Sequence, residues 1–243
     1  MPMAEPNSPS AAVEESGFDS GVYRLLAWLS PAFPAGSFAF SHGLEAAAES
    51  GAVHDRNSLQ HWVAAMVTLG SGRIDADILH DAHHAAAAGD IAGLIAVNRR
   101  GLAFRATAET ALETTAQGTA FLETCGAAWP EPFLKAWAAA LDGNAVCYAA
   151  AVGAAAARAS IALDWALGAY LQAMAANLVS AGLRLGIIGQ TDGQRILAAL
   201  EPAISMAVSA AQTRDPGSFG STTLAVELAS IAHETQYTRL FRS

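Results

Sequence analysis

Apolar side chains recur along this chain mostly at spacings of three and four residues, with short polar stretches between them. The clearest run begins at Asn57 or Ser58, and its apolar residues fall at i, i+3, i+4, i+7 and i+8: Leu59, Trp62, Val63, Met66 and Val67. That spacing gathers them on one face of an α-helix. The strict alternation of half-buried strands is hard to find. The pattern therefore predicts an all-α protein.

Glycine, proline and capping residues divide this pattern into about ten expected helices. A short helix is expected from Tyr23 to Leu29, followed by a structured loop from Pro31 to Phe40, because that stretch holds two prolines and a glycine. Ser41 is expected to cap a helix that runs to Ser50. Further helices are expected from Asn57 or Ser58, at 73–88, from Asp90, and at 106–128, 131–141, 145–158, 163–185, 191–212 and 222–233.

The short connections and the lack of a repeat of fixed period favour one compact multi-helix bundle. We assign this bundle to residues 21–232. Residues 1–20 are rich in Pro, Ser, Glu and Asp, so we expect them to form a flexible tail. Residues 233–243 differ from the bundle in composition and are predicted to form a separate C-terminal tail that binds a partner.

The composition supports a large core and excludes some classes of function. The chain is 53% hydrophobic and 14% charged, with a formal net charge of −9 and one lysine, Lys135. A nucleic-acid partner needs a basic surface, which this chain lacks, and anionic membranes are disfavoured for the same reason. Cys125 and Cys147 stand alone in apolar helical stretches, so buried structural thiols are expected.

One stretch raises the alternative of a membrane protein. Residues 165–183 lack charges over a length that could span a bilayer. The stretch is mostly Ala and Gly with scattered polar residues, which favours a buried central helix. The first twenty residues show no signal-peptide pattern, so a cytoplasmic protein is expected. A membrane protein that uses residues 145–187 remains the less favoured alternative.

A polar helix face suggests a second alternative. Asp77, His80, Asp81 and His84 are spaced i, i+3, i+4 and i+7, so a helix gathers them on one face. Two imidazoles and two carboxylates could hold a divalent metal, which would suit a metal-binding enzyme. An amphipathic surface helix accounts for the same pattern and is favoured. Otherwise we identify no catalytic constellation and expect no cofactor, since Tyr237 replaces the second histidine that a zinc-protease motif after His233 requires.

The C-terminal tail carries the strongest binding signal. Its last seven residues combine two aromatics, a leucine and two arginines, and aromatic and arginine side chains dominate protein–protein hot spots. The tail either folds back onto its own core or binds another protein. If it binds another protein, ordering it on binding would cost conformational entropy. The candidate binding residues are His233, Glu234, Gln236, Tyr237, Arg239, Leu240, Phe241 and Arg242.

Residues 189–194 look at first like a phosphate-binding loop. They lack the Lys-Ser/Thr pair of such loops, and no strand precedes them. We expect instead that Gly189 ends one helix in the left-handed conformation and that Thr191 and Gln194 form a capping box for the next.

Three segments in order resemble the UreF family of urease accessory proteins: SPAFPAGSFAFSHGLE at 30–45, LGIIGQTDGQ at 185–194 and HETQYTRLFRS at 233–243. The similarity runs from about residue 23 to the end. At 143–145 this chain reads Gly-Asn-Ala where relatives often have a histidine. Inside the first two segments the resemblance adds candidate partner-binding residues: Pro34, Gly36, Phe38, Ser41, Gln190 and Gln194.

The resemblance implies a helical, non-catalytic scaffold that acts in nickel insertion into urease. Proteins of this family associate with the accessory protein UreD, also called UreH, and recruit the GTPase UreG, often as a homodimer. The assembly then engages apo-urease. On this interpretation any GTPase chemistry belongs to the partner, and the C-terminal tail docks on UreD.

Overall fold

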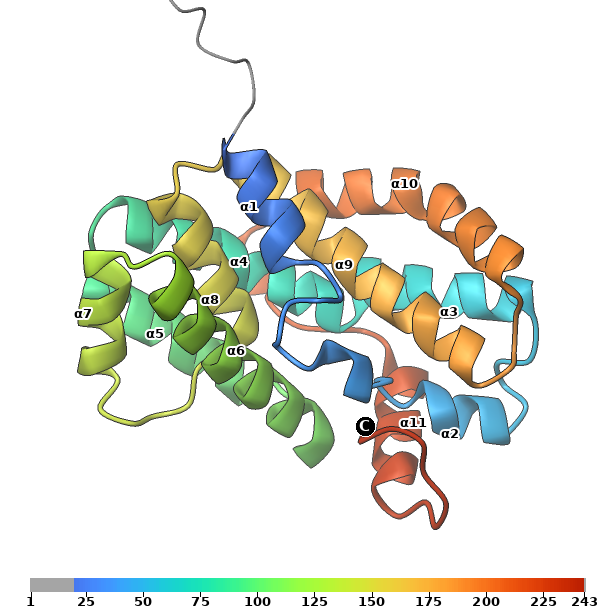
Figure 1. Cartoon of the computed structure of the whole chain (residues 1–243). Helices are drawn as coiled ribbons and strands as arrows, with labels where there is room; N and C mark the ends of the chain where they lie inside the picture. Colours follow the sequence, from blue (N-terminus) through green and yellow to red (C-terminus); the bar gives the residue numbers. More distant parts are fainter. Residues whose placement is uncertain (1–19, 243) are drawn as a thin grey trace, which may run out of the picture.

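The computed structural model describes residues 20–242, which form a compact bundle of eleven α-helices and two short 3-10 helices with no strand (Figure 1). The all-α prediction is confirmed. The 3-10 helices are η1 (Ser37–Ala39) and η2 (Pro216–Ser218). The α-helices are α1 (Ser20–Trp28), α2 (Leu44–Glu49), α3 (Arg56–Leu69), α4 (Ser71–Ala87), α5 (Ile91–Ala103), α6 (Ala108–Ala128), α7 (Pro132–Ala140), α8 (Tyr148–Arg158), α9 (Leu163–Arg184), α10 (Gln190–Thr213) and α11 (Leu224–Glu234). The tail predicted at residues 1–20 lies outside the described residues, except for Ser20 at the start of α1.

The centre of the bundle is the close packing of α4 on α8. Helix α8 is built mainly of alanine, and every residue from Ala149 to Ala156 is buried. Gly153 is required at the contact, because a Cβ there would lie 2.5 Å from the carbonyl oxygen of Leu79. Small side chains let two helix backbones approach, and close packing then supplies dispersion contacts without large side chains.

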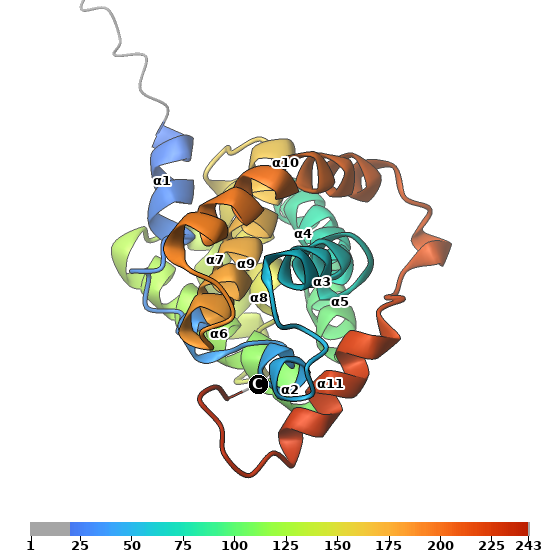
Figure 2. The same cartoon turned by 90° about the vertical axis from the view of Figure 1, so that its right-hand side faces the viewer.

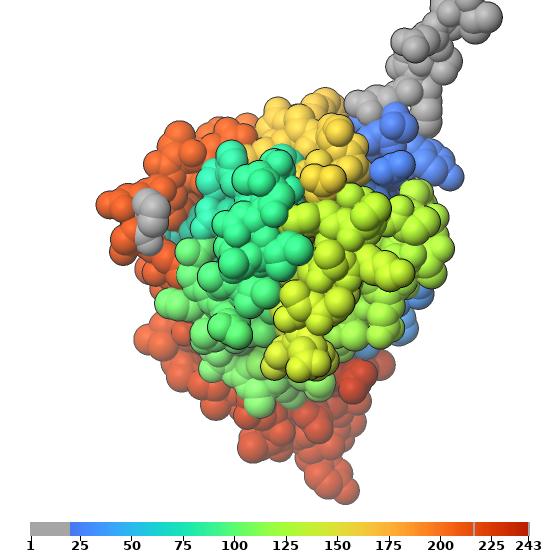
Figure 3. All heavy atoms as spheres, turned by 90° about the vertical axis from the view of Figure 1, so that its left-hand side faces the viewer, coloured from blue at the N-terminus to red at the C-terminus, as the bar shows by residue number. Residues whose placement is uncertain are grey.

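The other helices surround this pair. Helices α5, α6 and α9 pack on α8, and α3 and α10 pack on α4 and α9. Figure 2 shows α3 and α10 on one side of the bundle, and Figure 3 shows the opposite side with α5 and α7. Helices α2 and α11 pack on each other at the end of the molecule away from α1 (Figure 1). This end carries the candidate site.

Several helix starts follow the capping residues in the sequence. Asp90 caps α5 by accepting a hydrogen bond from the Gly93 amide at 2.8 Å, as predicted. Helix α3 is capped by Asp55, which accepts from the Ser58 amide at 2.8 Å. It therefore begins slightly before the predicted Asn57 or Ser58. Side chains that accept an orphan amide fix where a helix starts.

The predicted cap at Ser41 is wrong. Helix α2 begins at Leu44, and the residue before it, Gly43, has a φ of +75° with no side-chain cap. Gly43 also lies where α2 meets α11, since a Cβ there would be 2.5 Å from the Ser230 amide nitrogen. The buried Ser41 hydroxyl instead accepts a long hydrogen bond of 3.4 Å from the Glu45 amide. Glycine is thus needed here for both its backbone conformation and its size.

The predicted capping box at the start of α10 is also wrong. The helix begins at Gln190 after Gly189, and no side chain caps it, so Thr191 and Gln194 already lie inside the helix, in its first two turns. The left-handed residue after α9 is Gly186, with a φ of +74°, rather than Gly189. The break between the two helices therefore starts earlier than the sequence indicated.

Two helices, α9 and α10, are long and apolar enough to cross a membrane by length and composition alone. A core helix passes the same test. Helix α9 packs against α3, α4, α8 and α10, and half of its apolar window is buried. Its burial agrees with the predicted central helix.

Both cysteines, Cys125 and Cys147, are buried free thiols, as predicted. Burial raises the pKa of Cys125 to about 12, since a thiolate would be poorly solvated there. The Cys125 thiol therefore stays protonated and acts as a packing group.

Two glycines of α6 provide a matched test of this packing. A Cβ at Gly118 would lie 2.2 Å from the Val146 carbonyl oxygen, whereas nothing lies within 4 Å at Gly126. We expect Gly118→Ala to lower the free energy of unfolding by about 1–3 kcal/mol, because backbone must move. Gly126→Ala is expected to raise it by about 0.5–1 kcal/mol. Urea unfolding of both variants measures this, and equal effects would contradict the close approach of α6 to residue 146.

Candidate functional site

The candidate site is built around the C-terminal segment, defined here as residues 235–242. After α11 ends at Glu234 the chain turns back and lies against the bundle beside α2 (Figure 1). Phe241 is buried, while Tyr237 is fully exposed. His233 and Glu234, the first two residues of the predicted tail, complete the last turn of α11.

A buried cluster of His233, Glu45 and Glu109 anchors the segment. The His233 ring is fully buried, with Nδ1 2.8 Å from Glu109 Oε2 and Nε2 3.1 Å from Glu45 Oε2. The three side chains come from α11, α2 and α6. Residues almost 190 positions apart in the sequence thus meet in one hydrogen-bonded group.

The same two carboxylates hold the backbone and a side chain of the segment. Glu45 accepts hydrogen bonds from the amides of Leu240 at 2.7 Å and Phe241 at 2.9 Å. Arg239 Nη1 donates to Glu109 Oε1 at 3.0 Å. A buried carboxylate is costly unless donors surround it, so these bonds fix the path of the chain.

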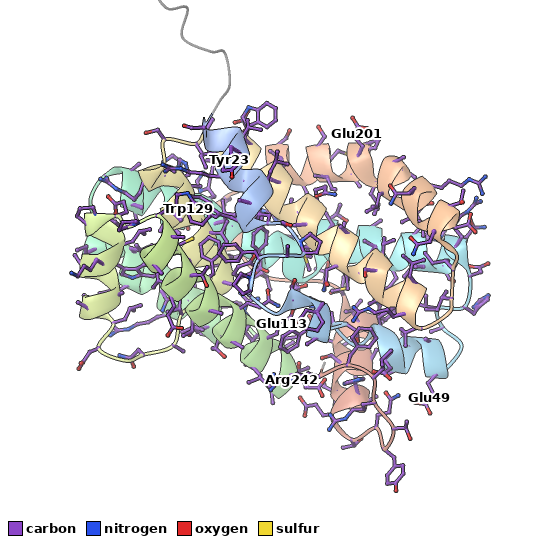
Figure 4. All side chains as sticks on the ribbon, viewed as in Figure 1. Tyr23, Glu49, Glu113, Trp129, Glu201 and Arg242 are labelled. Carbon is purple, nitrogen blue, oxygen red and sulfur yellow. The ribbon has the colours of Figure 1, made fainter. Side chains whose placement is uncertain are left out.

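The end of the segment contacts the loop that the sequence singled out near the N-terminus. The Arg242 amide donates to the Ala39 carbonyl oxygen at 2.8 Å. Arg184 of α9 lies 4.3 Å from the centre of the Phe241 ring and donates to the Phe38 carbonyl oxygen. Figure 4 shows Arg242 near the start of α6. The first and third motifs therefore form one structural unit.

The candidate residues divide into anchors and displayed groups. His233, Phe241 and Ser41 are buried, so in this conformation they shape the site and cannot touch a partner. The fold-back interpretation of the tail holds for these anchors. The exposed candidates on the tail and the N-terminal loop are Tyr237, Leu240, Arg239, Arg242, Glu234, Pro34 and Phe38; Gln236 and Gly36 are partly exposed. The anchors hold a surface on which an aromatic and a leucine remain open to solvent.

The outward face of α11 extends the apolar surface and was missed from the sequence. Leu224, Leu228 and Ile231 are 67%, 55% and 50% exposed, and their i, i+4 and i+7 spacing forms one stripe. The helix leads directly into the C-terminal segment. The spacing is present in the sequence, where it predicts only a short helix at 222–233.

Gln190 and Gln194 lie apart from this unit. Both are exposed in the first turns of α10. That end of α10 contacts the start of α3, where Arg56 Nη1 lies 3.8 Å from Asp192 Oδ1. The described contacts do not join either glutamine to the C-terminal segment, so their role as binding residues stays a prediction.

A cavity of about 370 Å³ lies between the loop before α2, α6 and α9. His42 Nε2 lies 3.0 Å from Glu113 Oε1, and Figure 4 shows Glu113 in the middle of the molecule. Arg105 Nη2 donates to Asp75 Oδ1 at 2.7 Å, and the Tyr170 hydroxyl donates to Asp75 Oδ2 at 2.9 Å. Each charged side chain in this lining therefore has an opposite or polar partner, as buried charges require.

These pairs shift the pKa values of their members. Burial acts to lower the pKa of His42, but the Glu113 carboxylate outweighs it and the net shift is upward. Burial also opposes the charge of Arg105, yet Asp75 holds its pKa above the ordinary value. Burial and the nearby Asp75 charge raise the pKa of Tyr170. One pair joins the loop before α2 to α6, the other group joins α4, α9 and the loop between α5 and α6, and the raised pKa keeps Tyr170 protonated.

The predicted metal-binding alternative on α4 is not supported. Asp77 is buried beside Arg214, whose Nε lies 3.1 Å from Oδ1 without hydrogen-bond geometry, and burial raises the pKa of Asp77. Asp81 pairs with Arg100 and with His80. Within residues 20–242, no three or more His, Cys, Asp or Glu side chains are arranged to hold a metal ion.

The fold and the site define an all-helical protein with a C-terminal segment anchored by buried carboxylates and carrying exposed apolar side chains. The UreF family model matches residues 53–201. A urease accessory protein UreF from Rhodopseudomonas palustris strain BisB5 is 46% identical over 238 residues, covering 98% of both chains. One from Bradyrhizobium sp. strain BTAi1 is 46% identical over 243 residues, covering all of both chains, and one from Granulibacter bethesdensis is 47% identical over 93% of this chain and 95% of its own.

The chain therefore belongs to the UreF family of urease accessory proteins. The family model ends at residue 201, before α11 and the C-terminal segment. The relatives extend across both, so the similarity includes the candidate site.

The His42–Glu113 pair predicts a pH dependence. A histidine whose folded pKa is raised stabilises the fold below its unfolded value near 6.5, and this contribution is lost as pH rises through the folded value. We expect the free energy of unfolding to fall as pH rises above about 6.5. His42→Gln should have a lower free energy of unfolding than the wild type at low pH, and this difference between the two proteins should become smaller at higher pH. Urea unfolding at several pH values measures the difference, and a difference independent of pH would contradict the coupling.

Proposed function

We propose that this chain is a non-catalytic scaffold that acts in nickel insertion into apo-urease by joining UreD, also called UreH, to the GTPase UreG. Membership of the UreF family supports this assignment. The acids and bases lining the central cavity are engaged with one another, which agrees with a binding role. On this proposal the protein acts in the cytoplasm.

One observation carries the proposal: large apolar side chains stay exposed on a segment whose backbone is firmly held. Tyr237 and Leu240 are fully and 62% exposed, although the amides of Leu240 and Phe241 are bound to a buried carboxylate. An exposed apolar group on a fixed backbone binds a partner with little loss of entropy. The stripe of Leu224, Leu228 and Ile231 adds apolar area on the adjoining helix.

The partner we assign to this surface is UreD. The surface combines aromatic and aliphatic groups with Arg239 and Arg242 at its edge, which is the composition of protein–protein hot spots. A homodimer belongs to the same proposal, with exposed apolar residues such as Trp165 of α9 and Met206 of α10 available to a second copy. Sizing of the purified chain tests the dimer.

Removal of residues 233–243 would be a poor test, because it deletes the buried anchors His233 and Phe241 together with the displayed residues. Point substitutions separate the two roles. Tyr237→Ala and Leu240→Ala remove exposed side chains and leave the anchoring bonds in place. Leu26→Ala on α1 is the matched control, since Leu26 is 69% exposed and belongs to another element.

We expect the Tyr237→Ala, Leu240→Ala double variant to weaken binding to UreD by about 30-fold or more, as loss of hot-spot residues does. Its thermal midpoint should stay within about 2 °C of the wild type, because exposed substitutions change stability little. Calorimetric titration with purified UreD measures the affinity. Wild-type affinity in the double variant, or an equal loss in Leu26→Ala, would show that UreD does not use this surface.

A further inference from the structure

The environment of His233 sets a requirement on its protonation. Nδ1 lies 2.8 Å from Glu109 Oε2 and Nε2 lies 3.1 Å from Glu45 Oε2, and the ring has no exposure to solvent. A neutral imidazole has one N–H and one lone pair, whereas the protonated ring donates at both nitrogens. Only the doubly protonated ring can donate to both carboxylates.

The charges around the ring agree with this requirement. Glu45 faces it from α2 and Glu109 from α6, and Arg239 of the C-terminal segment bonds to Glu109. The Glu234 carboxylate on α11 itself is turned to the Ala108 amide at the start of α6. Two carboxylates therefore face the ring and one guanidinium lies beside them, and a positive His233 balances the cluster.

The two carboxylates connect the ring to the segment. Glu45 Oε2 lies within hydrogen-bonding distance of both His233 Nε2 and the Phe241 amide, and Oε1 accepts from the Leu240 amide. If the ring loses a proton, a nitrogen lone pair faces a carboxylate oxygen at a ring that has no exposure to solvent. Any movement of Glu45 away from the ring then also breaks its bonds to the segment.

We propose that Glu45 and His233 are positioning residues that hold the C-terminal segment in its binding conformation, and that this hold is released when His233 loses its second proton. The inference rests on the proposed function for its purpose, since the segment displays Tyr237 and Leu240 to the partner. The hold itself is a property of the chain alone, so it can be measured without any partner.

Hydrogen exchange of the purified full chain, followed by mass spectrometry of a peptide covering residues 235–242, measures the hold. Rates are compared between about pH 6 and about pH 8.5, which brackets histidine titration, after correction for intrinsic exchange. We expect protection of this peptide to fall by about tenfold or more at the higher pH, as loss of one charge-assisted hydrogen bond would cause. Protection of α3 should fall much less than that of the segment, because α3 reports only the global change expected from the His42–Glu113 pair, whereas the release is local.

Two variants refine the test. His233→Gln keeps a polar group but cannot carry the charge, so its peptide should exchange fast at both pH values. His61→Gln on α3 is the matched control, because His61 is an exposed histidine outside the cluster, and it should keep the wild-type pH dependence. If His233→Gln does not fold, the wild-type pH series and ¹⁵N spectra of the histidine rings decide, since two protonated nitrogens are expected on His233 at about pH 6.

Equal corrected protection of the segment at both pH values, or a neutral His233 ring at about pH 6, would overturn the inference. So would loss of protection shared equally by α3, which would indicate global unfolding. None of these outcomes affects the test with Tyr237→Ala and Leu240→Ala. Loss of UreD binding can therefore hold while the positioning role fails, or the reverse.

Discussion

The C-terminal end of this protein depends on one buried carboxylate, that of Glu45. A carboxylate removed from water needs donors for its oxygens, or its burial costs several kcal/mol. Two of its donors are backbone amides of the C-terminal segment and a third is the ring of His233. These donors can meet Glu45 only if α2 lies against α11, which the absence of a side chain at Gly43 permits. The path of the last residues thus follows from a polar group far away in the sequence.

The rest of the bundle gives this end a firm base without contributing to the displayed surface. Helix α8 packs mainly through alanine and glycine, and its close contact with α4 needs no hydrogen bonds between side chains. Charged residues enter the interior mainly as pairs, such as Arg105 with Asp75, each linking separate elements. On the proposed function, the exposed apolar groups of α11 and the segment, rather than these interior pairs, contact the other protein.

Local patterns in the sequence predicted the helices well, because a 3.6-residue period and residues such as Asp90 act within one or two turns. They predicted the site less well. Composition identified the C-terminal tail but could not tell that Phe241 is buried while Tyr237 is exposed, since that depends on Glu45 and Arg184, residues distant in sequence. The metal alternative failed for the same reason. Arg214 pairs with Asp77 and Arg100 pairs with Asp81, and neither arginine belongs to α4, the helix that carries the polar pattern.

The anchored segment also changes the energetics expected of the proposed binding. A tail that becomes ordered only on binding loses conformational entropy at that moment, about 1–2 kcal/mol per residue for the backbone. Here the amides of Leu240, Phe241 and Arg242 are already bonded to the body of the protein. The backbone entropy of these residues is therefore lost during folding and not during binding. The displayed Leu240 then needs to lose mainly its own side-chain freedom. On the proposed function, a short surface of this kind binds tightly only while its anchors hold, so the buried cluster would influence the affinity without touching the partner.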